Sequence, residues 1–350
     1  MLQHAVGGSS ALRIRADASP YIGTGHVMRC LALAMAAREA GMNAHIICRA
    51  EVPWVRERLI RETVSCTLLS DNLPAEENPV TLLQQVRMTG NVTPCVHDSW
   101  VVLDGYHFTT ACHVALRQAG YRLLVIDDYA HLPEYNCNIL CNQNVGADGL
   151  AYAGSIEHAL FGPDYALLRP EFRRASALPA SDITNAQGTH VLLSLGGGDF
   201  SPWLKHIAPA LCVREMAHAR LSVLAGHMQE HEIRQAMKNI PSVVYVLPRV
   251  DDMASLLQGV DVCITAGGST CWELACMGVP FLTVEIAENQ HHICQWLASQ
   301  GYAPRFSTKA FVALLTDTKR RDHLSARLRG LVDGQGCTRV LDAIVTSHST

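Results

Sequence analysis

The sequence lacks the features that mark a nucleic-acid binder, a membrane protein or a secreted protein. Lys and Arg total 28 against 32 Asp and Glu, and the resulting net charge of -4 argues against a basic nucleic-acid surface. No apolar run approaches the roughly 20 residues that cross a bilayer, so no stable membrane association is expected. The first ten residues have neither a charged start nor a long apolar middle, which is typical of a loose tail rather than a secretory signal.

A disulfide framework and a metal-binding pattern are also missing. The thirteen cysteines are an odd number and are scattered through apolar segments, as at Cys30 and Cys276, which favours buried thiols in a reducing cytoplasm. The nearest approach to a metal pattern is Cys137-x-x-x-Cys141 with His131 upstream. Because this arrangement lacks the paired short spacings of a zinc site, we expect structural thiols, no metal and no cofactor.

What the sequence does contain is a regular alternation of short apolar strands with helices, present in both halves of its 350 residues. Such alternation predicts an α/β fold with parallel sheets, in which ligands lie beyond the carboxyl ends of the strands. The expected organisation is a loose tail over 1–11, an N-terminal Rossmann-like domain over 12–172, a linker over 173–188 and a second Rossmann-like domain over 189–350. The last helix is a candidate to return to the N-terminal domain.

The first segment with candidate functional residues consists of a predicted strand over 12–16, a glycine loop and a predicted helix over 26–40. The loop contains Gly23 and Gly25, and His26 lies in the first turn of the helix. A helix start offers free N–H groups and positive potential, which suits an anion and disfavours imidazolium, so a neutral His26 able to accept a proton is expected. The competing interpretation is that the glycines only make a tight turn and that His26 is a surface residue.

Polar side chains recur at the predicted strand ends of the N-terminal half. A strand-end aspartate is often only a helix cap or turn former, but parallel strands bring all of these ends to one edge. The residues concerned are Asp17, Asp104, Tyr106, Asp127, Asp128, Asn142 and Asn144.

The C-terminal half has a second glycine loop, in which Gly267 and Gly268 precede a helix that begins near Ser269 or Thr270. The glycines permit close approach of a phosphate to the backbone, and the helix start supplies N–H donors. Glu273 follows on this helix. The alternative is that Thr270 and Glu273 form a capping box, in which case the glutamate has no need of a ligand. An expected strand over 303–306 and helices over 308–347 complete this half.

Taken together, these segments resemble one family. They are Arg-Ala-Asp-Ala-Ser with Ile-Gly-Thr-Gly-His-Val-Met-Arg-Cys at the start, Val-Ile-Asp-Asp-Tyr-Ala at 125–130, Asn-Gln-Asn at 142–144, Gly-Pro-Asp-Tyr-Ala-Leu-Leu-Arg-Pro-Glu-Phe at 162–172, Ala-Gly-Gly-Ser-Thr-Cys-Trp-Glu at 266–273 and Glu-Asn-Gln at 288–290. The chain resembles, from about residue 12 onward, the nucleotide-sugar hydrolases of pseudaminic acid biosynthesis, which remove UDP from UDP-2,4-diacetamido-2,4,6-trideoxy-β-L-altropyranose. It departs from the usual pattern at Gly105, where many members have His, and at Phe200, where Pro is common.

The resemblance implies a GT-B architecture, two Rossmann-like domains facing across a cleft, and a cytoplasmic, monomeric, metal-independent hydrolase that inverts the anomeric carbon. The implied partners are the UDP-sugar and a catalytic water, in a pathway of flagellin glycosylation or surface polysaccharide synthesis. His26 is implied as the base, with Asp17 orienting it or its loop and Tyr106 assisting. The implied substrate-binding residues are Gly23, Gly25, Arg29, Asn142, Asn144, Tyr165, Gly197, Gly267, Gly268, Ser269, Thr270, Glu273, Asn289 and Gln290.

Two other functions fit the same residues. A GT-B glycosyltransferase would pass the sugar to an acceptor other than water, and those that work at membranes usually carry a basic, apolar docking patch, which the N-terminal half lacks as a sequence cluster. A non-catalytic UDP-sugar binder would not need His26.

Overall fold

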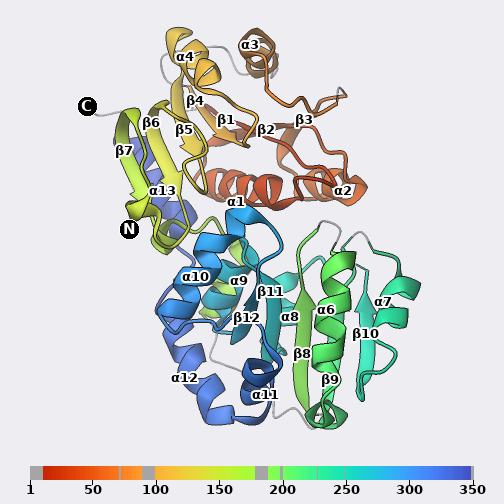
Figure 1. Cartoon of the computed structure of the whole chain (residues 1–350). Coiled ribbons are helices and arrows are strands. Elements are labelled where there is room, and N and C mark those ends of the chain that lie inside the picture. The colour runs from red at the N-terminus through yellow and green to blue at the C-terminus, as the bar shows by residue number, and fades with distance from the viewer. Residues whose placement is uncertain are drawn as a thin grey trace.

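The computed structural model describes residues 11–70, 72–88, 99–177, 188–197, 200–226, 228–248 and 250–347. It consists of two α/β domains, each built on one all-parallel sheet, and they lie one above the other in Figure 1. The carboxyl ends of the strands in both sheets face the junction between the domains. Sequence features assigned to 1–10, 178–187 and 198–199 lie outside the described residues.

The N-terminal domain contains a seven-stranded sheet in the order β3-β2-β1-β4-β5-β6-β7. One face packs on α1, α2 and α13, and the other on α3 and α4. Its central strands are buried on both faces, as expected for parallel strands covered by helices. The elements are β1 (Ala11–Ala16), α1 (Gly25–Glu39), β2 (Asn43–Cys48), α2 (Pro53–Arg61), β3 (Ser65–Leu68), α3 (Pro79–Arg87), β4 (Trp100–Asp104), α4 (Thr110–Gln118), β5 (Arg122–Ile126), β6 (Tyr135–Asn142) and β7 (Gly154–Phe161).

The chain then crosses to the C-terminal domain through a 3-10 turn (Pro163–Tyr165) and α5 (Pro170–Ser176). The second sheet has five strands in the order β10-β9-β8-β11-β12. The elements of the C-terminal domain are β8 (Thr189–Ser194), α6 (Ser201–Leu211), β9 (Ala219–Leu224), α7 (Glu230–Ala236), β10 (Val243–Leu247), α8 (Met253–Gln258), β11 (Val262–Ala266), α9 (Thr270–Met277), β12 (Phe281–Val284), α10 (His291–Ser299), α11 (Thr308–Thr316) and α12 (Thr318–Arg329), with 3-10 turns at Arg214–His218 and Glu288–Gln290. A further 3-10 turn, Ala147–Gly149, lies between β6 and β7 of the N-terminal domain.

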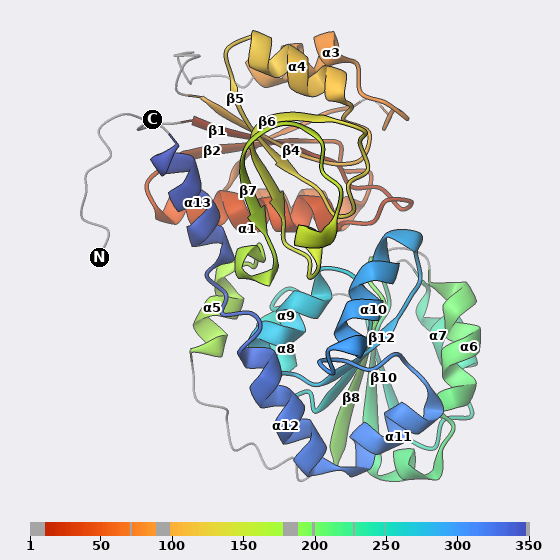
Figure 2. The ribbon, with the colours of Figure 1, turned by 60° about the vertical axis from the view of Figure 1, so that its left-hand side comes forward.

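The last helix, α13 (Gly336–Thr346), returns to the N-terminal domain. Val340, Leu341 and Ile344 are buried in the same apolar cluster as α1, and Figure 2 shows α13 beside α1 and β7. The crossing is tight, because a Cβ at Gly336 would lie 2.2 Å from the carbonyl oxygen of Ala166. The chain therefore passes twice between the domains, and the two crossings are in contact.

Several expected boundaries differ from the observed ones. The expected strand over 303–306 is wrong: this segment forms only an isolated bridge between Thr283 and Arg305, and Pro304 has no N–H to extend it. The first residues of the expected linker, up to Ser176, belong to α5. The edge strands β3 and β7 had not been predicted, because their sequences lack an apolar rhythm. Within the described residues, no helix is both long and apolar enough to span a membrane.

Candidate functional site

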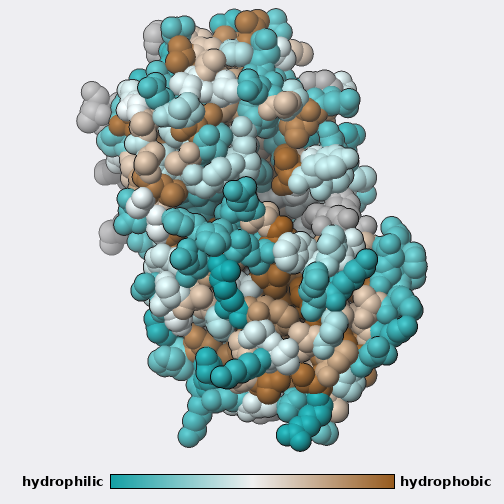
Figure 3. Space-filling model, in the orientation of Figure 1, coloured by the Kyte–Doolittle hydropathy of each residue, from teal (hydrophilic) through white to brown (hydrophobic). Residues whose placement is uncertain are grey.

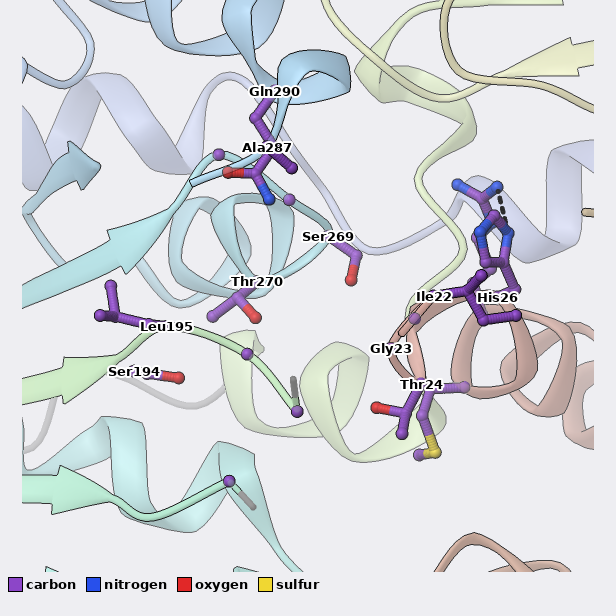
Figure 4. A pocket seen from close by; sticks show the side chains of 18 of the residues that line it. Ile22, Gly23, Thr24, His26, Ser194, Leu195, Ser269, Thr270, Ala287 and Gln290 are labelled. Carbon is purple, nitrogen blue, oxygen red and sulfur yellow. Dashed lines mark hydrogen bonds between the residues drawn. The ribbon is translucent and has the colours of Figure 1, made fainter. Parts of the chain in front are cut away.

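A cleft of about 880 Å³ lies between the two domains and is lined by residues from both. Figure 3 shows apolar side chains exposed near the junction between the two halves. Figure 4 shows Ile22, Gly23, Thr24 and His26 on one wall, and Ser269, Thr270, Ala287 and Gln290 on the other. Most of the expected site residues line it: Gly23, Gly25, His26, Arg29, Tyr106, Asn144, Gly197, Gly267, Gly268, Ser269, Thr270, Glu273, Asn289 and Gln290.

The loop after β1 is a closed turn that sets the start of α1. Ser19 and Gly23 exchange backbone hydrogen bonds of 3.3 and 2.9 Å, and the Ser19 hydroxyl accepts from the N–H groups of Tyr21 and Ile22. Gly23 has φ +75°, a conformation that a side chain disfavours. The turn therefore delivers the first residues of α1 to the cleft in a fixed position.

The starts of α1 and α9 face each other across the cleft. A Cβ at Gly25 would lie 3.7 Å from the Ser269 hydroxyl, and a Cβ at Gly197, after β8, would lie 2.9 Å from the Thr24 hydroxyl. Each helix start carries the positive end of a dipole, and at α9 the N–H groups of Gly268, Cys271 and Trp272 already donate to backbone oxygens at 2.8 to 3.0 Å. Two such ends directed at one space favour an anion, and neither N-cap side chain makes a capping hydrogen bond, although Glu273 lies in the first turn of α9.

The His26 ring is hydrogen-bonded to Asp104, which lies at the end of β4. Its Nδ1 lies 2.6 Å from Asp104 Oδ1, and its ring meets the edge of Tyr106 at a centroid distance of 4.9 Å. A carboxylate can only accept a hydrogen bond, so Nδ1 carries the hydrogen and Nε2 is left as the proton-accepting nitrogen. His26 lines the cleft, and its Nε2 is therefore the ring nitrogen that can accept a hydrogen bond.

Asp104 is fully buried and shared between His26 and Arg29. Arg29 donates to Asp104 through Nε and Nη2, each at 2.7 Å, and to Asp128 through Nη1 and Nη2 at 2.7 and 2.9 Å. Burial alone would raise the pKa of Asp104, but the Arg29 guanidinium and the His26 ring outweigh burial, so the pKa lies below its usual value. The carboxylate stays ionised beneath the histidine.

Tyr106 and Asn144 link this group to the C-terminal domain. The Tyr106 hydroxyl donates to Asp128 at 2.7 Å and accepts from the side-chain amide of Asn289 at 3.2 Å. Asn144 donates to Asp128 at 2.8 Å and accepts from the Trp272 indole at 3.2 Å. Burial and the neighbouring Asp128 raise the pKa of Tyr106, so its hydroxyl stays protonated.

On the C-terminal wall, the loop from β11 to α9 needs its first glycine. A Cβ at Gly267 would lie 2.4 Å from Cys294 Sγ, whereas nothing lies within 4 Å of a Cβ at Gly268. The capping-box alternative for Glu273 is not realised, because α9 starts at Thr270 and its N-cap, Ser269, makes no side-chain cap. Glu273 instead lines the cleft and accepts from Arg169 at 3.3 Å.

Asp17, Asn142 and Tyr165 are outside the residues that line the cleft. The expectation that Asp17 orients His26 is not met by the geometry, since Asp104 contacts His26. Asn142 turns back to Tyr152, with its amide 2.8 Å from the Tyr152 hydroxyl. Tyr165 lies in the crossing segment, packed against the apolar cluster of α1 and α13.

Asp17 belongs instead to a buried ionic cluster behind the cleft loop. It accepts from Arg15 and from Arg49, whose guanidinium groups both also pair with Glu77. His107 Nε2 lies 3.0 Å from Asp17. Asp17, Glu77 and His107 have ligand atoms close enough to hold a metal ion, but the two guanidinium groups already neutralise both carboxylates, which does not suit a cation.

Several residues in the cleft or behind it had not been assigned a role from the sequence. Asp104 and Asp128 were recognised only as strand-end carboxylates, and the ion pairs with Arg29 depend on strands far apart in sequence. Arg169 was part of a recognised motif, yet no local signal placed it against Glu273. Gly105 was noted as unusual; its Cβ would lie 2.7 Å from the His107 ring, so glycine there makes room for the buried imidazole.

Two facing parallel-sheet domains with a shared cleft define a GT-B protein. No protein-family model matches the chain. Over 96% of its length it superposes on 99% of MurG from Acinetobacter baumannii with a TM-score of 0.65 at 15% identity, which supports the same fold.

Two curated relatives match parts of the sequence. The spore coat polysaccharide biosynthesis protein SpsG of Bacillus subtilis is 28% identical over 193 residues, covering 51% of this chain and 56% of SpsG. The UDP-N-acetylglucosamine–N-acetylmuramyl-(pentapeptide) pyrophosphoryl-undecaprenol N-acetylglucosamine transferase of Lacticaseibacillus casei is 26% identical over 145 residues, covering 41% of this chain and 38% of the transferase. The chain thus matches about half the length of SpsG and less of the transferase.

Proposed function

We propose that the protein is an enzyme that cleaves the glycosyl bond of a UDP-sugar in the interdomain cleft. The observation that carries this proposal is the convergence of two helix starts on the cleft, with His26 oriented by Asp104 at its edge. One wall suits a leaving diphosphate, and the other holds a base. The names of the two relatives, one in polysaccharide synthesis and one using a UDP-sugar, support this substrate class.

In this proposal the diphosphate binds at the start of α9, on the backbone of Gly267, Gly268 and Ser269. As the anomeric carbon–oxygen bond breaks, negative charge grows on the departing UDP, and the helix start stabilises it without needing to move. Gly267 permits the close backbone approach, and Glu273, which also lines the cleft, accepts hydrogen bonds from the ribose hydroxyls.

Water is the proposed acceptor. Its oxygen attacks the anomeric carbon on the face opposite the diphosphate, while His26 Nε2 takes its proton and the electron pair of the broken bond leaves with UDP. A single displacement inverts the anomeric centre. Asp104 keeps the His26 hydrogen on Nδ1 and stabilises the imidazolium that forms, which is a positioning role.

For the sugar, we propose UDP-2,4-diacetamido-2,4,6-trideoxy-β-L-altropyranose, following the sequence resemblance. Tyr106, Asn144 and Asn289 line the cleft near His26 and present amide and hydroxyl groups that suit two N-acetyl substituents. The hydrogen bond between Asn289 and Tyr106, and those that Tyr106 and Asn144 donate to Asp128, hold the three side chains in place before the sugar arrives, so recognition needs little reordering. Metal independence, a cytoplasmic location and a monomeric state remain part of this proposal.

A glycosyltransferase is the second candidate, because one relative is named as a transferase that uses UDP-N-acetylglucosamine. It would use the same donor wall and the same base, with an acceptor hydroxyl in place of water. The two reactions differ only in what reaches His26.

The test is a proton NMR time course of the purified protein with the altrose-configured UDP-sugar, without an acceptor. UDP and free sugar, with the first anomer opposite to the starting one, would support the inverting hydrolase. Binding of the UDP-sugar without turnover, followed by turnover on adding a sugar acceptor, would support the transferase. Failure to bind UDP or any UDP-sugar would refute both.

A further inference from the structure

The crossing segment between the domains places a buried arginine against the glutamate of α9. Arg169 lies just before α5, is 8% exposed and lines the cleft. Its Nη2 lies 3.3 Å from Glu273 Oε1 and its Nη1 lies 3.1 Å from Glu171 Oε1. Its guanidinium also lies over the Phe172 ring, 5.2 Å from the centroid, which fixes its plane.

From this geometry we infer that Arg169 is a positioning residue that holds the Glu273 carboxylate in place to accept the ribose hydroxyls of the bound nucleotide. The inference rests on the UDP-sugar activity proposed above and adds to it a residue of the Leu-Leu-Arg-Pro-Glu-Phe motif. One arginine nitrogen occupies one oxygen of Glu273, which leaves the second carboxylate oxygen, Oε2, for a ligand.

The surroundings explain why Glu273 needs a cation beside it. Burial raises the pKa of Glu273, Glu171 raises it further, and Arg169 is the group that opposes both. Arg169 faces Glu171, Glu273 and, more distantly, Asp252. Arg58 of α2 pairs with Glu171 at 3.6 Å. Removing Arg169 would therefore leave Glu273 half-buried without a neighbouring positive charge, and it would take up a proton at a higher pH.

The variant to make is Arg169→Gln, with Arg58→Gln as the matched control, because both arginines are buried, line the cleft and pair with Glu171. Binding of UDP and of 2′,3′-dideoxy-UDP is measured by calorimetry between pH 5.5 and 8.5. We expect Arg169→Gln to weaken UDP about 10- to 100-fold at pH 7, as for the loss of a charged hydrogen bond. The dideoxy nucleotide lacks the hydroxyls that Glu273 would bind, so Arg169→Gln should weaken its binding by less than about threefold.

The pH dependence of UDP binding distinguishes this role from a purely structural one, because a structural role of Arg169 would not change that dependence. Since a protonated Glu273 is a poorer acceptor, UDP binding by Arg169→Gln should weaken further as the pH falls and recover as it rises, while Arg58→Gln keeps the wild-type profile. In a protein that already carries Glu273→Gln, adding Arg169→Gln should weaken UDP binding little further. Equal losses for UDP and dideoxy-UDP, independent of pH, would mean that Arg169 contacts the diphosphate directly and would overturn the inference.

A measurement without nucleotide separates this inference from the proposed function. Glutamate labelled with ¹³C at the carboxyl carbon reports the titration of Glu273, identified as the signal missing in Glu273→Gln. Arg169→Gln should move that titration to higher pH, and Arg169→Lys, a variant for use if the glutamine variant fails to fold, should keep it near wild type. If the protein binds no UDP, the proposed function fails, yet this titration still tests the Arg169–Glu273 coupling. An unmoved titration refutes it.

Discussion

Replacing Asp104 by Asn should separate the orienting carboxylate from the base. Asp104 Oδ1 receives His26 Nδ1 and Arg29 Nη2, and Oδ2 receives Arg29 Nε and the Cys30 thiol. An asparagine keeps one oxygen and replaces the other by an NH₂ donor. If the NH₂ replaces Oδ1, His26 Nδ1 must accept, the ring hydrogen moves to Nε2, the base is lost, and the NH₂ also meets the Arg29 Nη2 donor. If the NH₂ replaces Oδ2, it meets the Arg29 Nε donor. A buried donor that meets a donor costs about 1 to 3 kcal/mol.

The expected fall in turnover is about 10²- to 10⁴-fold, the range for loss of a general base, which corresponds to about 3 to 5 kcal/mol of transition-state stabilisation. Folding stability should fall by about 3 kcal/mol, the lower end of the range for a broken buried ion pair, because Arg29 still has its ion pair with Asp128. UDP affinity should change little, since Asp104 lies on the opposite wall from Gly267 and Ser269. The assays are UDP release, calorimetric UDP binding and thermal unfolding.

The matched control is Asp17→Asn. Asp17 is as buried as Asp104, pairs with two arginines and has a pKa that burial raises but His107 and Arg15 bring well below its usual range. We expect it to lose comparable stability while turnover stays within about threefold, a small change compared with loss of a base. Turnover of Asp104→Asn within tenfold of wild type, or a larger loss in Asp17→Asn, would refute the assignment of Asp104 as the orienting residue.

Three further predictions follow from the other parts of the cleft. Gly267→Ala should weaken UDP binding at least about tenfold and destabilise the domain by about 1 to 3 kcal/mol, because its Cβ would overlap Cys294 Sγ. Calorimetry measures the UDP affinity and thermal unfolding measures the stability. The control is Gly268→Ala, which should be tolerated because its Cβ meets nothing within 4 Å. UDP release should persist in chelator; its loss, with rescue by a divalent ion, would contradict metal independence. The pKa of Glu273 is raised in the folded state, so its ionised form destabilises the folded protein at a pH above the unfolded-state pKa. Glu273→Gln should therefore unfold at a higher temperature than wild type at pH 8, and the difference in unfolding temperature should shrink toward pH 5. A difference that does not depend on pH would contradict this.

The fold was largely predictable because buried parallel strands have a strong sequence signal. The apolar runs of β4 and β5, ending at Asp104 and just before Asp127, are of this kind, and they form neighbouring strands. The edge strands β3 and β7 escaped prediction since each is paired on one side only and carries polar residues along much of its length. Edge strands do not need an apolar rhythm, so periodicity does not reveal them.

The candidate site was predictable where one loop contains the whole signal. Gly267 and Glu273 belong to one strand, loop and helix, so spacing alone placed them together. The partner of His26 was not predictable in this way, because Asp17 is near it in sequence whereas Asp104 is near it in space. The order β1-β4-β5 in the sheet decides this, since it brings the end of β4 directly beside β1. Only the topology distinguishes the two carboxylates.

The division of the cleft between the domains has a consequence for acceptor choice. The donor wall, with Gly267, Ser269 and Glu273, belongs to the C-terminal domain, and hydrolase and transferase would use it alike. In the proposed reaction the attacking group approaches past His26 and Tyr106, which the N-terminal domain holds through Asp104 and its neighbours. Substitutions on the C-terminal wall should therefore change nucleotide affinity for either reaction, whereas substitutions around His26 should change which acceptor is used. Under the proposed mechanism, the choice between water and another acceptor is then a property of the N-terminal wall.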